Sequence, residues 1–280
     1  MSETQTVAVE TFRTLHAEGC FVLPNPWDAG TAVYLRHLGF KALATTSAGF
    51  AFSKALPDAP SVLAVDVVLA HIRDIVEATP LPVNADFQNG YADSPEDVGA
   101  NVTRCIDTGV AGLSIEDATG TSETPLYDIQ LAVERIKAAR RAIDDSGIPV
   151  VLTGRCEAYL VRDPNAFSVS LERLSDYADA GADCLYAPGV TDPREIDAIV
   201  KAVSPKPVNV LVSRPDPNLT LTALTSLGVR RISVGSALAR VAWGSFMRAA
   251  QSIATTGTFD SLGESAGFAE LNSIFERSES

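Results

Sequence analysis

The ten residues TGVAGLSIED (108–117) contain the unit whose repetition determines the architecture. Gly109 can take the left-handed conformation that commonly ends a helix. The run that begins at Gly112 is continuously apolar instead of alternating, which is typical of a parallel strand buried on both faces. It ends in two carboxylates, Glu116 and Asp117. A helix end, a buried strand and a polar strand terminus therefore follow one another along the chain.

Seven further apolar runs resemble this unit, and amphipathic helical stretches separate them. Eight strand–helix units close a parallel (β/α)8 barrel of the TIM type, an α/β fold of about 250 residues. The chain of 280 residues is therefore predicted to be a single barrel domain, residues 1–280, with an additional C-terminal helix. The other strands are predicted at Cys20–Asn25, Ala42–Ser47, Pro82–Phe87, Pro149–Arg155, Cys184–Gly189, Pro207–Val212 and Arg230–Gly235.

The connecting segments give further expectations. A helix over Thr11–Glu18 could cover the floor of the barrel, and a long loop over Ala48–Pro60 follows the second strand. Ser61–Ala78 is predicted to be a helix. The polar loop Ala118–Pro125 follows the fourth strand, and Gly120 could serve as its hinge if it closes as a lid. Such barrels carry their chemistry at the C-terminal ends of the strands, so the predicted site lies there.

The composition restricts the possible partners. The formal net charge is −13, and nucleic acid is excluded because phosphate binding needs a basic face. An anionic substrate would need local positive charge from a metal ion or an arginine. The four cysteines form no C-x-x-C pair, which favours reduced thiols. No apolar run approaches about 18 residues, and the first residues lack a signal-peptide pattern. We therefore expect a cytoplasmic protein without membrane association.

Acidic side chains end two neighbouring strands. Asp86 ends the third predicted strand, and Glu116 and Asp117 end the fourth. Adjacent strands lie about 4.8 Å apart, so these carboxylates repel each other unless a cation or a proton is shared. Oxygen ligands suit Mg²⁺. The three histidines all fall on predicted helices, which argues against zinc or iron. The alternative for Asp86 is a helix cap or an ion pair, and for Asp117 a cap or support.

Arg155 ends the fifth strand in the sequence Gly154-Arg155-Cys156-Glu157. Its two-pronged guanidinium could bind a substrate carboxylate, with Glu157 orienting it. A purely structural role among the acids is the alternative. Cys156 has no histidine placed to activate it, so a nucleophilic role is not expected.

Small and hydroxyl-bearing residues end the second strand. The backbone N–H groups of Ser47, Ala48 and Gly49 could hold an oxyanion, or the segment could be a tight turn. Asp58 could lie near the site or cap a helix. Asn209, on the seventh strand, is an amide donor that could bind substrate or pack internally.

The chain resembles the isocitrate lyase/phosphoenolpyruvate mutase superfamily. The resemblance implies a Mg²⁺ site at Asp86 and Glu116, with Mn²⁺ as an alternative ion, and a small anionic 2-oxo or 2-hydroxy acid as substrate. It implies catalytic roles for Arg155, Glu116 and Asp58, and substrate binding by Ser47, Ala48, Gly49, Trp27 and Asn209. It rests on Asn25-Pro26-Trp27-Asp28, Thr46-Ser47-Ala48-Gly49, Leu56-Pro57-Asp58, Asp86-Phe87-Gln88-Asn89-Gly90-Tyr91, Ile115-Glu116-Asp117, Gly154-Arg155-Cys156-Glu157-Ala158, Pro207-Val208-Asn209-Val210 and Arg231-Ile232-Ser233-Val234-Gly235.

The chain also differs from named branches of that superfamily. The loop after the fourth strand reads TGTSET (119–124), where isocitrate and methylisocitrate lyases carry Lys-Lys-Cys-Gly-His. No lysine stands between Asp117 and Lys137, although the phosphonopyruvate enzymes use one there, and Gln88 replaces the second acid. The resemblance thus favours a Mg²⁺-dependent carbon–carbon lyase that acts through an enolate and is similar to oxaloacetate decarboxylase. A C–P bond enzyme of the phosphonopyruvate type and a non-catalytic oxo-acid binding protein are the alternatives.

Two questions stay open at this point. The general acid or base is not identified, and the candidates are Glu116 through water, Tyr159, or a residue of the 118–125 loop. The tail, residues 261–280, is predicted to form a helix over Phe268–Arg277 with an apolar stripe that must be buried. It could pack on its own barrel. The resemblance favours a helix swapped onto a neighbouring subunit in a homo-oligomer, either a dimer or a homotetramer.

Overall fold

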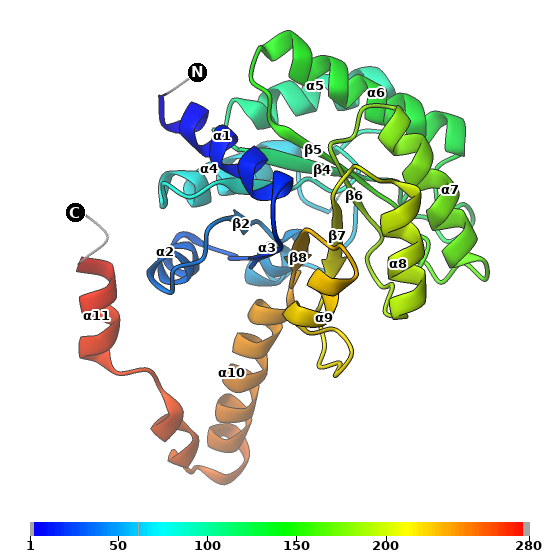
Figure 1. Cartoon of the computed structure of the whole chain (residues 1–280). Coiled ribbons are helices and arrows are strands. Elements are labelled where there is room, and N and C mark those ends of the chain that lie inside the picture. The colour runs from blue at the N-terminus through cyan, green and yellow to red at the C-terminus, as the bar shows by residue number, and fades with distance from the viewer. Residues whose placement is uncertain (1–2, 61, 277–280) are drawn as a thin grey trace.

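The computed structural model describes residues 3–60 and 62–276 and contains eight parallel strands surrounded by helices (Figure 1). The hydrogen-bonded strand order is β1-β8-β7-β6-β5-β4-β3-β2. The N–H of Ala44 in β2 donates to the carbonyl of Pro24, just after β1, at 3.0 Å, which links the two ends of the sheet. The predicted (β/α)8 fold is therefore confirmed. The strands are β1 (Phe21–Leu23), β2 (Leu43–Ala44), β3 (Val83–Asp86), β4 (Gly112–Glu116), β5 (Val151–Arg155), β6 (Cys184–Tyr186), β7 (Val208–Leu211) and β8 (Arg231–Ser233).

Helices follow every strand and form the outer layer, as Figure 1 shows. They are α1 (Glu3–Ala17), α2 (Ala29–His37), α3 (Ser47–Ser53), α4 (Val65–Glu77), α5 (Pro95–Ile106), α6 (Ile129–Ser146), α7 (Ala166–Asp179), α8 (Pro193–Ala202), α9 (Leu221–Ser226), α10 (Ala237–Thr256) and α11 (Phe268–Glu276), with a short 3-10 helix at Asp260–Glu264.

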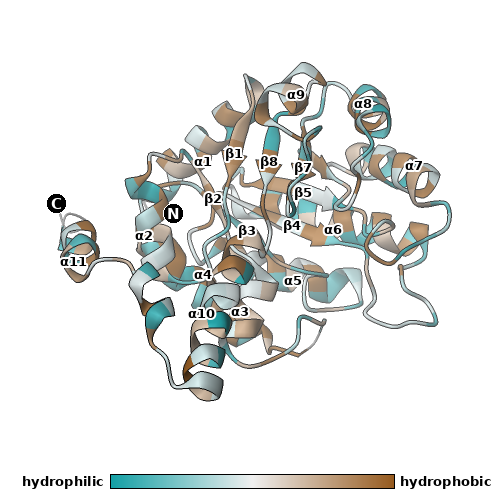
Figure 2. Cartoon of the chain, turned by 90° about the horizontal axis from the view of Figure 1, so that it is seen from below, coloured by the Kyte–Doolittle hydropathy of each residue, from teal (hydrophilic) through white to brown (hydrophobic). Residues whose placement is uncertain are grey.

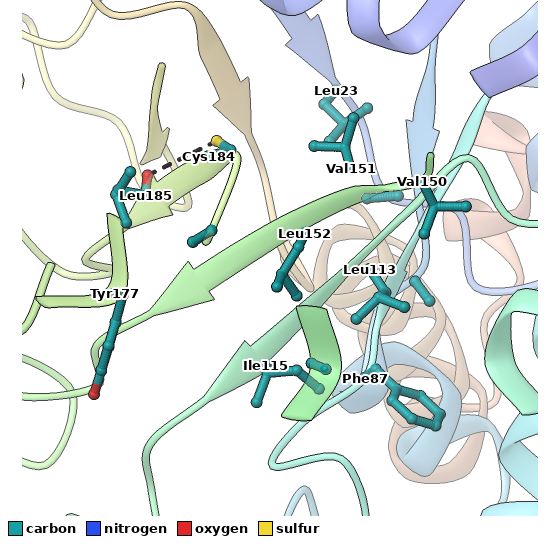
Figure 3. Packing of buried hydrophobic residues seen from close by; sticks show 14 of the residues in the cluster. Leu23, Phe87, Leu113, Ile115, Val150, Val151, Leu152, Tyr177, Cys184 and Leu185 are labelled. Carbon is teal, nitrogen blue, oxygen red and sulfur yellow. Dashed lines mark hydrogen bonds between the residues drawn. The ribbon is translucent and has the colours of Figure 1, made fainter. Parts of the chain in front are cut away.

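The core lies between the strands and this helical layer. Leu113 and Ile115 of β4 and Leu152 of β5 are at most 2% exposed, and Figure 3 shows them packed in one cluster. The side chain of Tyr177, from α7, is 1% exposed and belongs to the same cluster. Continuous burial explains why these strands show no alternation of polar and apolar residues.

Helix α1 covers the N-terminal ends of the strands. Phe12 is fully buried, and its ring would lie 2.7 Å from a Cβ added at Gly112, so only glycine fits at the start of β4. His16 Nε2 lies 3.3 Å from Arg231 Nη1 at the start of β8. Burial and then Arg231 lower the pKa of His16 to about 3, so the ring is neutral. The helix begins at Glu3 instead of the predicted Thr11.

The predicted loop over 48–60 is wrong in its first part, because it contains helix α3. Thr46 caps this helix by accepting a hydrogen bond from Gly49 N–H at 3.2 Å. A Cβ at Gly49 would lie 2.6 Å from Thr46 Cγ2, so the tight cap requires glycine. Helix α4 begins at Val65, later than the predicted Ser61, which lies outside the described residues.

Helices α10 and α11 form an arm that leaves the barrel (Figure 1). Figure 2 shows hydrophobic residues on both helices. Helix α11 returns to pack on α2 of the same chain, where Ile274 is buried and the Phe275 ring would lie 3.8 Å from a Cβ at Gly30. Within residues 3–60 and 62–276, we find no helix with the length and apolar character needed to cross a bilayer.

Candidate active site

The C-terminal ends of β3, β4 and β5 gather three carboxylates around one guanidinium. Glu116 pairs with Arg155 in the register of β4 and β5, and Asp86 lies on the next strand. Nη1 of Arg155 is 3.0 Å from Asp86 Oδ1 and 3.1 Å from Glu116 Oε2. Nε of Arg155 donates to Glu157 Oε1 at 2.5 Å. The expectation that Glu157 orients Arg155 agrees with this contact, and all four side chains are at most 17% exposed.

Asp86 is held by the end of β2 as well. The N–H and the hydroxyl of Ser47 both donate to Asp86 Oδ2 at 2.9 Å, and the N–H of Asp86 donates to Thr45 Oγ1 at 2.9 Å. Ser47 thus contacts the carboxylate that is predicted to bind the metal. Oδ2 of Asp86 accepts both hydrogen bonds from Ser47, whereas Oδ1 faces Arg155 and still has a second lone pair.

Asp117 supports the site from behind. Its Oδ1 accepts the N–H of Glu157 at 2.8 Å, and its Oδ2 accepts the hydroxyl of Tyr177 at 2.6 Å and Nη1 of Arg173 at 3.0 Å. Asp117 is 3% exposed, and both of its oxygens are bonded to these partners. Asp117 therefore supports the Arg155–Glu157 segment. This is the supporting role that the sequence left open as an alternative to metal binding.

A cavity of about 520 Å³ opens beside this cluster. Gln88 Nε2 lies 3.5 Å from Asp58 Oδ1 at its edge. Asp86 is not part of the cavity wall and lies just behind Ser47 and Arg155. The lining residues are Ser47, Asp58, Ala59, Pro60, Gln88, Glu116, Ala118, Gly120, Thr121, Ser122, Pro125, Arg155, Glu157, Leu160 and Val161.

The cluster has an excess of negative charge. Burial raises the pKa of Glu116 well above its ordinary value, and the neighbouring carboxylates raise it further although Arg155 lowers it. Burial also raises the pKa of Glu157, and burial followed by repulsion from Asp86 raises that of Asp58. One guanidinium therefore faces more carboxylates than it can neutralise, so the site favours an additional positive charge.

The donor set is compatible with Mg²⁺, although no preformed ligand cage exists. In the described part of the chain, no three His, Cys, Asp or Glu side chains are already grouped as metal ligands. Asp86 and Glu116 nevertheless bond the same nitrogen of Arg155, so their oxygens converge on one region. Mg²⁺ commonly takes one or two carboxylates and keeps several waters, which this pair can provide. The residues present therefore fit a divalent cation that keeps water ligands.

The structure brings only part of the predicted substrate-binding set to the cavity. Ser47 lines it, and Ala48 and Gly49 follow in the first turn of α3. The N–H of Gly49 is used in the cap on Thr46, and that of Ser47 is used on Asp86. These two amides are therefore already bonded to the protein.

Trp27 and Asn209 lie elsewhere. Trp27 lines a different crevice, with Lys54 and His71, between α2, α3 and α4. Asn209 is 1% exposed and donates to Ser233 Oγ at 2.9 Å, while its oxygen accepts Nε of Arg231 at 3.1 Å. Both ends of this amide are thus engaged inside the barrel.

The other candidates for proton transfer differ in position. The hydroxyl of Tyr159 donates to Glu195 at 2.8 Å and does not line the cavity. The 118–125 segment forms a small hairpin through the bridge between Ala118 and Leu126, and four of its residues line the cavity with Ala118. Gly120 has φ +82°, and a Cβ there would lie 2.9 Å from Pro60 Cγ. The hairpin therefore contacts the segment that carries Asp58.

Some lining residues were not anticipated from the sequence, among them Leu160 and Val161. Leu160 and Val161 follow Glu157 in a turn and form part of the cavity wall. The ring of Tyr186, on β6, lies 5.2 Å from the guanidinium carbon of Arg155. The only sequence signal for Leu160 and Val161 is their position directly after the Arg155–Ala158 segment.

Comparison with known proteins agrees with this geometry. A family model described as phosphoenolpyruvate phosphomutase matches residues 12–254. A crystal structure from Burkholderia cenocepacia, provisionally described as a lyase/mutase, is 46% identical, covers 98% of this chain and 97% of its own, and superposes with a TM-score of 0.93.

Curated relatives give the same assignment. An uncharacterized protein of Mycobacterium tuberculosis is 33% identical over 81% of this chain and 82% of its own length. The oxaloacetate decarboxylase of Pseudomonas entomophila is 30% identical over 81% of this chain and 78% of its own length. The match covers far more than half of the chain, so the chain belongs to the phosphoenolpyruvate phosphomutase family, within the isocitrate lyase/phosphoenolpyruvate mutase superfamily.

Proposed function

We propose that the protein is a Mg²⁺-dependent lyase that cleaves a carbon–carbon bond of a small 2-oxo or 2-hydroxy acid or diacid through an enolate. The single observation that carries this proposal is the cluster in which Asp86, Glu116 and Glu157 surround Arg155 beside a cavity of about 520 Å³. The similarity to an oxaloacetate decarboxylase supports the same reaction class.

The metal would be held by Asp86 and Glu116, and Mn²⁺ could replace Mg²⁺ at oxygen ligands. When bound, such an ion supplies positive charge that stabilises the negative charge developing on the substrate oxygens. Ser47 fixes the orientation of Asp86 through two hydrogen bonds, so this carboxylate is held in place before any ligand arrives. Ala48 and Gly49 follow Ser47 in the first turn of α3.

Arg155 is placed to bind the substrate carboxylate. Its Nε and Nη1 are used by the three carboxylates, whereas Nη2 has no partner among residues 3–60 and 62–276. Arg155 lines the cavity, so Nη2 can donate to an anionic ligand there. The surrounding acids keep the guanidinium charged, because Glu116, Glu157 and Asp86 raise its pKa even though burial lowers it.

Proton transfer is assigned to the carboxylates that line the cavity. Asp58 and Glu116 both line it, and both have a raised pKa for the reasons given above. A raised pKa allows a carboxyl group to hold and release a proton near neutral pH. We assign the general acid–base role to Asp58, with Glu116 as the residue that holds the metal and water.

The test is pyruvate release from a panel of oxo acids with Mg²⁺, with EDTA, and with the Asp86→Asn variant. The proposal predicts release that requires Mg²⁺ and is abolished by Asp86→Asn, whereas the surface variant Arg194→Ala keeps full activity because its side chain is 90% exposed. Phosphate release from phosphonopyruvate would instead establish C–P bond chemistry. Thermal stabilisation by oxo acids without turnover would establish a binding protein.

We also propose that the arm mediates homo-oligomer formation, as a dimer or tetramer, with the tail 261–280 packing on a neighbouring subunit of this barrel domain; residues 277–280 of this tail lie outside the described residues. Large apolar side chains on the arm are exposed, among them Phe246 (62%), Phe259 (63%) and Phe268 (83%). The contact of α11 with α2 could be made equally within a chain or between two chains. Light scattering on the intact protein and on a Phe246→Glu/Phe268→Glu variant tests this, with a smaller species expected for the variant. The free cysteines are consistent with a cytoplasmic location.

A further inference from the structure

The lining of the cavity combines charged, apolar and neutral polar residues. Asp58, Glu116, Arg155 and Glu157 form the charged wall. Ala59, Pro60, Ala118, Pro125, Leu160 and Val161 supply the apolar surface, here called the apolar wall, and Ser47, Gln88, Thr121 and Ser122 add neutral polar groups. Small-molecule sites of this kind bind the apolar part of a ligand on one side and orient it with a few polar groups on the other.

Leu160 and Val161 of the apolar wall lie in the loop that also carries Glu157 of the charged wall. The N–H groups of Leu160 and Val161 both donate to the carbonyl of Glu157, at 2.8 and 3.0 Å. The Leu160 side chain packs on the loop after β6, because its Cδ2 atom would lie 3.2 Å from a Cβ added at Gly189. Leu160 is nevertheless 49% exposed, and its free surface borders the cavity. The turn that follows Glu157 therefore fixes the positions of Leu160 and Val161 relative to Glu157.

Positive charge is confined to one position. Among the described lining residues, Arg155 is the single cation, whereas three carboxylates line the same cavity. Arg162, the next cation along the chain, is exposed and does not belong to the lining. A ligand with one carboxylate can place it on Arg155. A second carboxylate would find no second cation among the described lining residues. The neutral donors of Gln88, Thr121 and Ser122 would leave its charge unpaired, and the apolar residues and the carboxylates are unfavourable surroundings for it.

We propose that the substrate carries a single carboxylate and an uncharged, apolar far end, as in a 4-hydroxy-2-oxo acid with an alkyl group on C4. This inference rests on the proposed function and narrows it. In the cleavage, the C3–C4 bond breaks and its electron pair forms the enolate of pyruvate. The 4-hydroxyl loses its proton to a cavity carboxylate as C4 becomes an aldehyde carbon. That proton is returned to C3, so the products are pyruvate and an aldehyde, and no oxidant or reductant is needed.

The test compares two substrates that differ at one group. 4-Hydroxy-2-oxopentanoate carries a methyl group at C4, and 4-hydroxy-2-oxoglutarate carries a carboxylate there. With Mg²⁺ present, we expect kcat/KM for pyruvate release to be at least about tenfold higher for the methyl compound, because the second carboxylate meets like charges. Thermal stabilisation by the unreactive pair 2-oxopentanoate and 2-oxoglutarate should follow the same order, which gives a readout independent of turnover.

A charge placed on the apolar wall should reverse this preference. Leu160→Lys is expected to favour the diacid, whereas Leu221→Lys, at an equally exposed leucine of α9 (50%), should leave the ratio unchanged. A wild-type preference for the diacid, or a Leu160→Lys variant with the wild-type ratio, would overturn the inference while leaving the lyase proposal intact. A diacid preference that disappears in Arg162→Ala would identify Arg162 as a second cation and also overturn it. No pyruvate from any oxo acid would instead refute the proposed function itself.

Discussion

Replacing Arg155 by alanine should destabilise the fold strongly at alkaline pH and much less at acidic pH. The substitution removes the ion pairs to Asp86, Glu116 and Glu157, whose side chains are 17%, 10% and 7% exposed. Removing one partner of a buried ion pair costs about 3–5 kcal/mol, because the remaining charge is left without a partner. We therefore expect Arg155→Ala to lose about 3–5 kcal/mol of unfolding free energy at pH 8.

The pH dependence follows from the raised pKa values of Glu116 and Glu157. A carboxyl group whose pKa is higher in the folded than in the unfolded protein favours folding below its ordinary pKa, and this contribution is lost as pH rises to the folded pKa. Arg155 lowers the pKa of both groups, so its removal raises them further and widens this window. At pH 5 the variant can protonate these carboxyls, and the loss should be clearly smaller.

Urea unfolding at pH 8 and pH 5, analysed by linear extrapolation, measures both losses. Arg194→Ala is the matched control, since its ion pair with Asp192 is exposed, and its unfolding midpoint should equal that of the wild type at both pH values. A loss of the same size at both pH values, or one below about 1 kcal/mol at pH 8, would show that the carboxylates do not depend on the guanidinium for neutralisation.

Three further outcomes follow from the same contacts. Asp117→Ala should lower the free energy of unfolding in urea by about 3–5 kcal/mol, because Arg173 loses its buried partner. It should also lower kcat/KM, because the N–H of Glu157 loses its acceptor, and unchanged kinetics would contradict the supporting role of Asp117. Gly120→Val should raise KM in steady-state assays, since φ +82° and the contact with Pro60 exclude a side chain there; an unchanged KM would exclude a role for the hairpin in binding. Mg²⁺ affinity measured by calorimetry should rise with pH and release protons, because the raised pKa of Glu116 makes a proton compete with the ion; a pH-independent affinity without proton release would argue against Glu116 as a ligand.

The strands and the charged cluster could be predicted because both follow from local patterns. Continuous apolar runs identify buried strands, and parallel strands bring their ends together, so Asp86, Glu116 and Arg155 were expected to meet. Helix α3 was missed because its seven residues, SAGFAFS, are too short and too uniformly small or apolar to show a helical period. Its cap depends on the fit of Gly49 against Thr46, which is a tertiary contact.

Asn209 shows a different limit of sequence reasoning. The sequence left both substrate binding and internal packing open for this residue. In the structure its partners come from β8, where Arg231 and Ser233 engage both ends of the amide. The sequence contains no signal that a buried arginine would lie beside it. Leu160 and Val161 could not be assigned to the cavity from the sequence either. Their direction is set by the turn after Glu157, whose carbonyl accepts hydrogen bonds from both of their N–H groups.

The most direct test of the account is calorimetric titration of oxalate, an analogue of the enolate, into the wild-type protein with and without Mg²⁺. We predict binding only when Mg²⁺ is present, loss of that binding in Asp86→Asn, and retention in Arg194→Ala. Oxalate binding of equal strength without Mg²⁺, or in Asp86→Asn, would contradict the claim that Asp86 holds a divalent cation beside Arg155.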